Sequence, residues 1–74
     1  MSRTYTLSEV AEACKLSINM IYKAIEQGQL RAIEVGLARH GVKRVVTEED
    51  LLAYKRWRVR FMGDFYPELD PEAG

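Results

Sequence analysis

Apolar positions near the start of the chain recur every three to four residues, which is the period of an α-helix. The repeat consists of Leu7, Val10, Ala11 and Cys14. Thr6 and Glu9 fit a capping box before it, because the Thr6 hydroxyl can accept from the Glu9 amide and the Glu9 carboxylate from the Thr6 amide. This pattern predicts a short amphipathic helix over residues 7–14, with Cys14 as a small buried hydrophobic residue.

A second helix is predicted over residues 18–27. Ser17 is a suitable N-cap, and Gly28 is placed to end the helix in the left-handed conformation. Its buried face is made by Ile21, Ala24 and Ile25. Residues 15–17 form the connection to the preceding helix. Two short amphipathic helices joined by such a turn match the helix-turn-helix unit.

After the second helix the chain turns to short runs rich in β-branched residues, 30–35 and 42–46. Gly36 and Gly41 flank the segment between them. The pattern predicts a β-hairpin with a loop of four to six residues. Basic residues gather on the loop and the second strand, namely Arg39, His40, Lys43 and Arg44. A basic hairpin directly after a helix-turn-helix is typical of a wing.

A third helix is predicted from the N-cap Thr47 to about Met62, with Gly63 after it. Its first turn contains three carboxylates, which interact favourably with the positive end of the helix dipole: Glu48, Glu49 and Asp50. The side chains predicted to face the core are Leu51, Tyr54, Trp57, Phe61 and Met62. Arg58 lies on the same side by angle, where its apolar stem can pack at the edge of the core.

The remaining positions of this helix leave alternatives open. Leu52 and Val59 form a second apolar strip, which fits either packing against the hairpin or contact with another copy of the chain. Arg56 and Arg60 point outward together, as a solvated face or as DNA contacts.

Composition limits the classes of function for these 74 residues. An apolar fraction of 47% with 30% charged residues is typical of one globular domain. One Cys and one His cannot supply a four-ligand zinc site, and a lone Cys excludes an internal disulfide. The sequence also lacks a phosphate-binding glycine loop and a nucleophile paired with a base. We therefore expect no catalysis, no metal, no cofactor and no small-molecule substrate.

No apolar run approaches the roughly 18 residues of a membrane span, and the first residues lack the apolar stretch of a signal peptide. We therefore expect a cytoplasmic protein with no membrane partner.

Charge is distributed unevenly although the net charge is zero. Residues 1–63 hold all 11 basic residues and seven of the 11 acidic ones, whereas residues 64–74 hold the other four acidic residues. A +4 body suits a polyanionic partner, since the field near a surface follows local charge. We divide the chain into a DNA-binding domain, 1–63, and an acidic tail, 64–74. Phe65, Tyr66 and Leu69 are predicted to fold the start of the tail back on the domain.

The order of these elements resembles the excisionase-type branch of the winged helix-turn-helix proteins, which is related to MerR-like DNA-binding domains. The segments that resemble it are YTLSEVAEACKLS, NMIYKAIEQGQL, VGLARHGVKRVV and TEEDLLAY. The resemblance implies an α+β winged helix-turn-helix fold with two short helices, a hairpin wing, a third helix and an acidic C-terminal tail. It also implies a sequence-specific architectural DNA-binding protein, an excisionase of a phage or prophage, in a bacterial, nucleoid-associated setting. Such a protein loads cooperatively near an attachment site, bends DNA and directs a tyrosine integrase toward excision.

Ten residues are predicted to contact DNA: Ser17, Ile18, Asn19, Met20, Tyr22, Lys23, Arg39, His40, Lys43 and Arg44. The Asn19 amide matches adenine N6 and N7, and it equally fits a solvated surface residue. Lys23 fits a phosphate contact or a pair with Glu26 three residues on. The family usually has basic or hydroxyl residues where this chain has Ile18-Asn19-Met20. We therefore expect one copy to bind weakly and several copies together to bind well.

The expected partners are double-stranded DNA, further copies of the chain placed head to tail or side by side, and a tyrosine integrase. A small MerR-like transcriptional regulator fits the same residues. A protein-interaction adaptor also fits these residues. Such an adaptor would use the same fold to bind the acidic surface of a partner protein, and the apolar start of the second helix favours this alternative.

Overall fold

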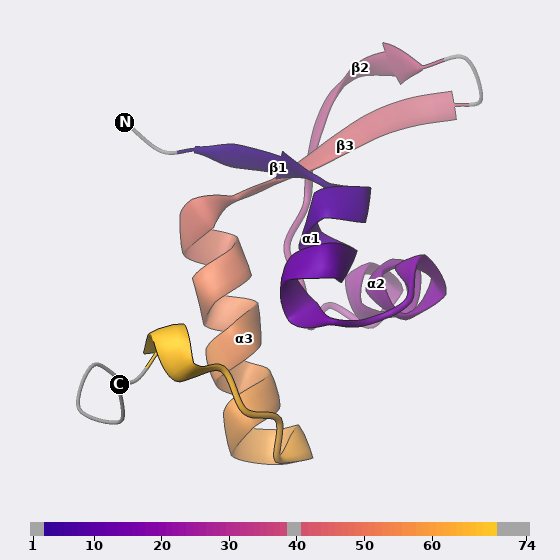
Figure 1. The fold of residues 1–74 in the computed structure, drawn as a ribbon. Coiled ribbons are helices and arrows are strands. Elements are labelled where there is room, and N and C mark those ends of the chain that lie inside the picture. The colour runs from indigo at the N-terminus through magenta and orange to yellow at the C-terminus, as the bar shows by residue number, and fades with distance from the viewer. Residues whose placement is uncertain (1–2, 39–40, 70–74) are drawn as a thin grey trace.

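The computed structural model describes residues 3–38 and 41–69, which form three helices and a three-stranded antiparallel sheet (Figure 1). The order is β1 (Thr4–Thr6), α1 (Leu7–Cys14), α2 (Ile18–Glu26), β2 (Ile33–Ala38), β3 (Gly41–Thr47), α3 (Glu48–Met62) and the 3-10 turn η1 (Pro67–Leu69). The fold is a small α+β winged helix-turn-helix, as predicted.

The predicted caps define the helix ends. The Thr6 amide donates to Glu9 Oε1 at 2.8 Å and the Glu9 amide to Thr6 Oγ1 at 3.1 Å, which completes the capping box of α1. The hydrogen bond from the Thr6 amide also holds the pKa of the Glu9 carboxyl below its ordinary value. Ser17 Oγ accepts from the Met20 amide at 3.3 Å at the start of α2. Gly63 ends α3 with φ +75°, a left-handed conformation that glycine adopts without a Cβ clash.

The sheet has the strand order β1-β3-β2, so that β3 lies between two antiparallel neighbours. β1 was not predicted; it pairs Tyr5 with Val46 at the start of the domain. In the hairpin, Ala38 pairs with Gly41, and a bulge falls between Glu34 and Gly36. The predicted hairpin is present, and the predicted strand 42–46 lies within β3. The first strand begins at Ile33 rather than at residue 30, and both strands continue further toward the turn, so the predicted loop of four to six residues was too long.

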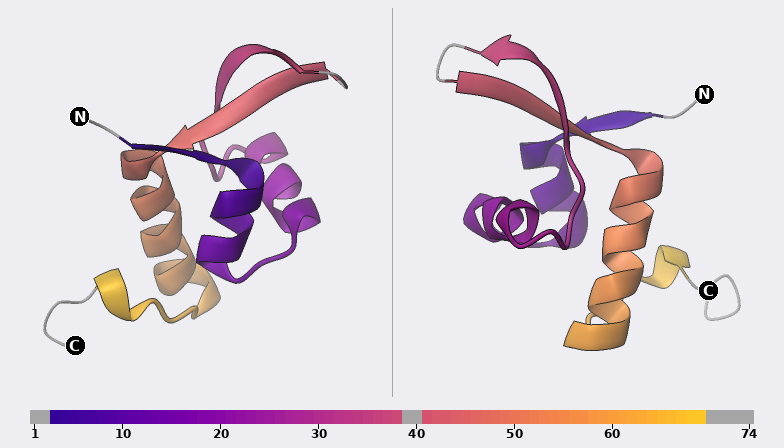
Figure 2. Two further views of the ribbon diagram at one scale, coloured as in Figure 1. Left: turned by 45° about the horizontal axis from the view of Figure 1, so that its top comes forward. Right: turned by 180° about the vertical axis from the view of Figure 1, so that it is seen from behind.

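The core lies where the helices meet one face of the sheet (Figures 1 and 2). Its buried side chains are Val10, Ala11, Cys14, Ile21, Ala24, Leu30, Val46, Leu51, Tyr54 and Tyr66. Trp57 is half-buried and stacks on Tyr54, with ring centroids 6.0 Å apart. The prediction that Phe61 and Met62 face the core was wrong, because they are 64% and 55% exposed. The last turns of α3 extend past α1 and α2, and Phe61 contacts Trp57 of its own helix, with ring centroids 5.7 Å apart, instead of the core.

The start of the tail packs back on the domain through Tyr66, which is 5% exposed and belongs to the core. Leu69 packs against the same cluster, whereas Phe65 is 72% exposed, contrary to its prediction. The division at Gly63 stays a prediction, and residues 70–74 lie outside the described residues.

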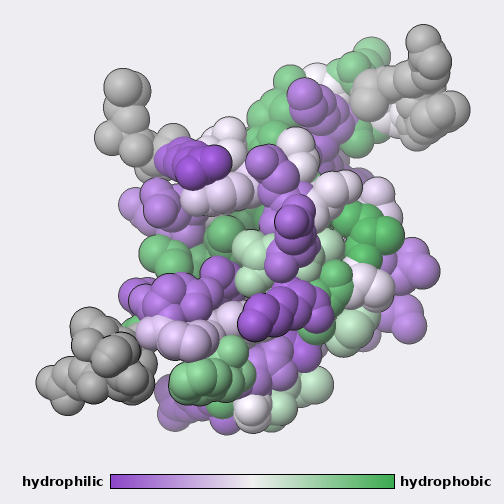
Figure 3. Space-filling model, viewed as in Figure 1, coloured by the Kyte–Doolittle hydropathy of each residue, from purple (hydrophilic) through white to green (hydrophobic). Residues whose placement is uncertain are grey.

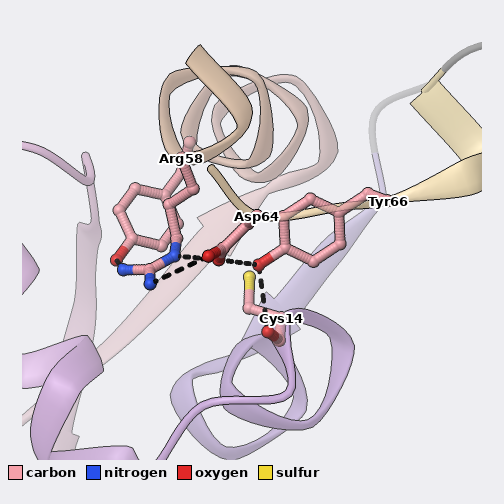
Figure 4. Close-up of polar contacts among 5 residues, drawn as sticks. Cys14, Arg58, Asp64 and Tyr66 are labelled. Atoms are coloured by element: carbon pink, nitrogen blue, oxygen red, sulfur yellow. Dashed lines mark hydrogen bonds and ion pairs between the residues drawn. The ribbon is translucent and has the colours of Figure 1, made fainter. Parts of the chain in front are cut away.

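Two buried cations of α3, Lys55 and Arg58, fix this segment, and Figure 4 shows the contact of Arg58 with Asp64. The Arg58 guanidinium forms an ion pair with Asp64, and Lys55 Nζ lies 2.8 Å from Glu68 Oε1. Arg58 is only 7% exposed, so its burial without Asp64 would leave an unpaired charge in a poorly hydrated site. The Arg58 guanidinium holds the pKa of the Asp64 carboxyl below its ordinary value.

Candidate nucleic-acid interface

The outer face of α2 presents four of the predicted DNA-binding residues to solvent. Asn19, Met20, Tyr22 and Lys23 are exposed, while Ile21 on the opposite face is fully buried. The helical period of 3.6 residues places Asn19 and Lys23, four apart, next to each other on this outer face. A row of exposed polar side chains on a rigid helix is what contact with a groove requires.

The two residues at the start of α2 have local structural roles. Ile18 is half-buried and packs against the core cluster. The Ser17 hydroxyl accepts from the Met20 amide, so it is engaged as the N-cap. The first turn of α2 contains no acidic side chain, so the positive end of its helix dipole is open to an anion such as phosphate.

The hairpin presents its cations on both faces of the sheet. Lys43 and Arg44 are both exposed, and neighbouring strand residues point to opposite faces. Val46, two residues after Arg44, is buried in the core. Arg44 therefore lies on the sheet face that also covers the core, and Lys43 lies on the reverse face. Glu34 pairs directly with Arg44 in the register, which places a carboxylate beside this cation.

Arg39 and His40, the other two predicted wing residues, lie outside the described residues.

α2 and the free end of the β2–β3 hairpin lie on the same side of the molecule (Figures 1 and 2). α3 and the tail segment lie on the opposite side in the same views. α2, the helix that contains Asn19 and Lys23, thus lies on the same side as the hairpin that holds Arg44. Two separated contact elements on one side allow a duplex to be held by a helix in the major groove and a hairpin on the adjacent backbone.

Sequence reasoning missed two apolar residues of the hairpin. Leu37 is 89% exposed, and Val42, its partner in the register, is 45% exposed. The β-branched runs indicated strands but not which side chains extend past the core. That distinction depends on the register with β3, which the bulge at Glu34 and Gly36 shifts by one residue.

The described part of the chain offers little basis for a metal site or a membrane span. No group of three or more potential metal ligands occurs among residues 3–38 and 41–69. Within the same segments, no helix has the length and apolar character needed to cross a membrane. A shallow groove between α2 and α3 has a volume of about 180 Å³ and is lined by Met20, Lys23 and Trp57 among others.

A family model described as a helix-turn-helix domain matches residues 4–58. The chain belongs to this family. Helix-turn-helix domains of this family bind DNA, and the family includes excisionase-like proteins. No match to a curated protein or to a solved structure was found. In this helix-turn-helix protein the matched segment begins at β1 and ends at Arg58. Asp64 and Tyr66, which contact Arg58 and the core, lie after the matched segment.

Proposed function

We propose that this helix-turn-helix protein is an architectural DNA-binding protein of the excisionase type. In this proposal α2 enters the major groove and the β2–β3 hairpin lies against the neighbouring backbone or minor groove. Several copies load side by side near a recombination site and bend it, and a tyrosine integrase is thereby directed toward excision. The observation that supports this most directly is that α2, with its exposed Asn19 and Lys23, and the cationic hairpin lie on one side of the molecule.

The side chains of α2 divide into base and phosphate contacts. The Asn19 amide has one donor and one acceptor, which match adenine N6 and N7 in the major groove. Lys23 and the Tyr22 hydroxyl fit phosphate oxygens at the groove edge. Met20 supplies apolar surface for a thymine methyl group. Because the Ser17 hydroxyl caps the helix, the contribution of this end to phosphate binding comes from exposed backbone N–H groups.

Low net positive charge on this side favours action by several copies. Lys23, Lys43 and Arg44 are the cations of the predicted contact set within the described chain, and Glu26 and Glu34 lie among them. Each phosphate contact adds to affinity through counterion release, so a small number of contacts gives weak binding of one copy. Bending a short duplex costs on the order of 1–6 kcal/mol. Several weakly bound copies can supply this free energy together.

The experiment that tests the proposal is a mobility-shift titration against an A·T-rich duplex a few helical turns long, at low and moderate salt. A ladder of complexes that fades as salt rises is expected, together with a bend detected by circularly permuted fragments. Arg44→Ala is expected to weaken binding. Arg56→Ala, which removes an exposed cation from α3, the helix on the opposite side of the molecule, is the matched control.

Two results would contradict the proposal. The absence of any shift at low salt would remove DNA binding and favour the protein-adaptor alternative. Specific binding without a bend would remove the architectural role and favour a transcriptional regulator.

A further inference from the structure

Leu37 is the most exposed large apolar side chain in the described part of the chain, at 89%. It pairs across the hairpin with Val42, which is 45% exposed, so the two form one apolar surface near the end of the hairpin. In the space-filling view, hydrophobic residues cover much of this end of the hairpin (Figure 3). Exposing a leucine forgoes the stabilisation that burial would give.

The register places this apolar pair on the same sheet face as Arg44. Val42, Arg44 and Val46 alternate along β3 and therefore share one face. Val46 lies over the core, Arg44 beyond it, and Val42 with Leu37 furthest out. The bulge between Glu34 and Gly36, where Gly36 has φ +148°, adds local twist to β2 just before Leu37. The apolar surface thus lies at the outer end of a hairpin that extends on the same side as α2.

We propose that Leu37, supported by Val42, acts as an apolar wedge that inserts between base pairs from the minor groove and kinks the duplex. This inference rests on the proposed DNA-binding function. Leucine and other apolar side chains at the end of a structural element can unstack a base step, and cations beside them hold the backbone. Arg44 and Lys43 on the adjacent strand supply those cations.

Charge favours DNA over a protein as the occupant. The apolar pair is followed directly on β3 by two exposed cations, an arrangement that fits a groove with phosphates along both walls. β2 is also an edge strand of the sheet, so pairing with a second copy is the competing outcome that the experiment must separate.

The test uses a duplex that holds one copy, with 2-aminopurine at the step under the hairpin, and compares wild type with Leu37→Ser. At a protein concentration that saturates this single site, wild type is expected to kink the duplex locally and to raise the 2-aminopurine fluorescence, because unstacking relieves its quenching. Leu37→Ser is expected to lose the fluorescence rise and to reduce the bend, since a wedge kinks DNA by roughly 20–90°. The dependence of affinity on salt is expected to stay the same, because no charge is removed.

Val59→Ser is the matched control, because Val59 is an exposed valine on α3 at 42%, close to the exposure of Val42. It is expected to leave the bend and the fluorescence unchanged. Circular dichroism of each variant checks that the fold is retained, which the exposure of both side chains favours.

The outcomes separate the wedge from the proposed function. Unchanged bend and fluorescence in Leu37→Ser would overturn the wedge while DNA binding stands. Loss of cooperativity on a multi-site duplex, with the single-copy bend intact, would instead assign Leu37 to a contact between copies and overturn the wedge. Failure of the wild type to bind any duplex would show that the proposed function itself is wrong.

Discussion

The Tyr66 hydroxyl lies 3.0 Å from the backbone carbonyl oxygen of Cys14, 52 residues earlier in the chain. The same hydroxyl lies 2.9 Å from Asp64 Oδ2, so its single proton is shared between two acceptors (Figure 4). Burial, followed by the Asp64 carboxylate, raises the pKa of the Tyr66 phenol. Tyr66 therefore joins the end of α1 to the segment after α3 while it fills part of the core.

Tyr66→Phe is expected to destabilise the protein by about 1–2 kcal/mol, because it leaves the Cys14 carbonyl without this donor while the ring still fills its site. Urea unfolding followed by circular dichroism measures the change. The control is Phe65→Ala, which truncates the neighbouring exposed ring and is expected to alter the free energy of unfolding by less than about 0.5 kcal/mol. Equal effects of the two substitutions would contradict the role assigned to Tyr66.

Acid is expected to weaken the fold through Asp64. A carboxyl whose pKa is lower in the folded state stabilises the protein above its unfolded pKa, and this stabilisation is lost as pH falls through the folded pKa. The ordinary value for Asp64 is 3.8, so the loss begins as pH approaches 3.8 and continues below it. Asp64→Asn is expected to lower stability at neutral pH and to reduce the decrease between neutral and acidic pH.

The measurement is urea unfolding of wild type and Asp64→Asn across this pH range. Part of the pH dependence is expected to remain, because the pKa of Glu68 is also lowered, by its hydrogen bond from Lys55. Glu12→Gln, which alters an exposed carboxylate of α1, is the control. A pH dependence that is identical in wild type and Asp64→Asn would contradict the prediction.

Asn19→Ala and Arg44→Ala are expected to weaken DNA binding in different ways. Loss of a bidentate amide contact costs about 1–3 kcal/mol at the preferred A·T position and relaxes discrimination there. Loss of a phosphate contact weakens binding to all sequences and lowers the slope of log affinity against log salt by about 1. Affinities for matched and mismatched duplexes at several salt concentrations separate the two. A change of salt slope in Asn19→Ala would contradict its assignment as a base contact.

Glu34→Gln is expected to strengthen DNA binding, because Glu34 is opposite Arg44 in the sheet register and its negative charge opposes the attraction of this cation to phosphate. Exposed charge pairs contribute roughly 0.2–1 kcal/mol, and the gain should decrease as salt rises. Titration of a fluorescent duplex at two salt concentrations measures it. Glu49→Gln on α3 controls for the change in net charge, and an equal gain in that variant would show that the position of Glu34 is unimportant.

Local signals in the sequence predicted the helices well. Thr6, Ser17 and Thr47 each accept a hydrogen bond from a backbone amide within three residues, so a short stretch of sequence contains all the determinants of each helix start. The exposure of Asn19 and Lys23 likewise followed from the helical period of α2.

Features that depend on distant residues were not predictable in the same way. β1 is only three residues long, and its pairing of Tyr5 with Val46 defines it. The helical period of α3 predicted the side of the helix on which Phe61 lies. It did not predict where along α3 the packing of α1 and α2 against the helix ends. The burial of Arg58 depends on an ion pair with Asp64 beyond a turn, and the length of the hairpin connection depends on the register between its strands.

The helix-turn-helix match ends at Arg58, yet the counter-ion of Arg58 and a core aromatic ring follow it in the sequence. Asp64 and Glu68, two of the four acidic residues after Gly63, neutralise cations of their own chain. Any attraction of the tail to a neighbouring copy is therefore left to the charges of Asp70 and Glu72. A chain shortened at Gly63 would lose the core residue Tyr66 together with the negative charge of the tail. Charge-neutralising substitutions of Asp70 and Glu72 leave the core intact. They therefore isolate the effect of the tail charge on cooperative loading.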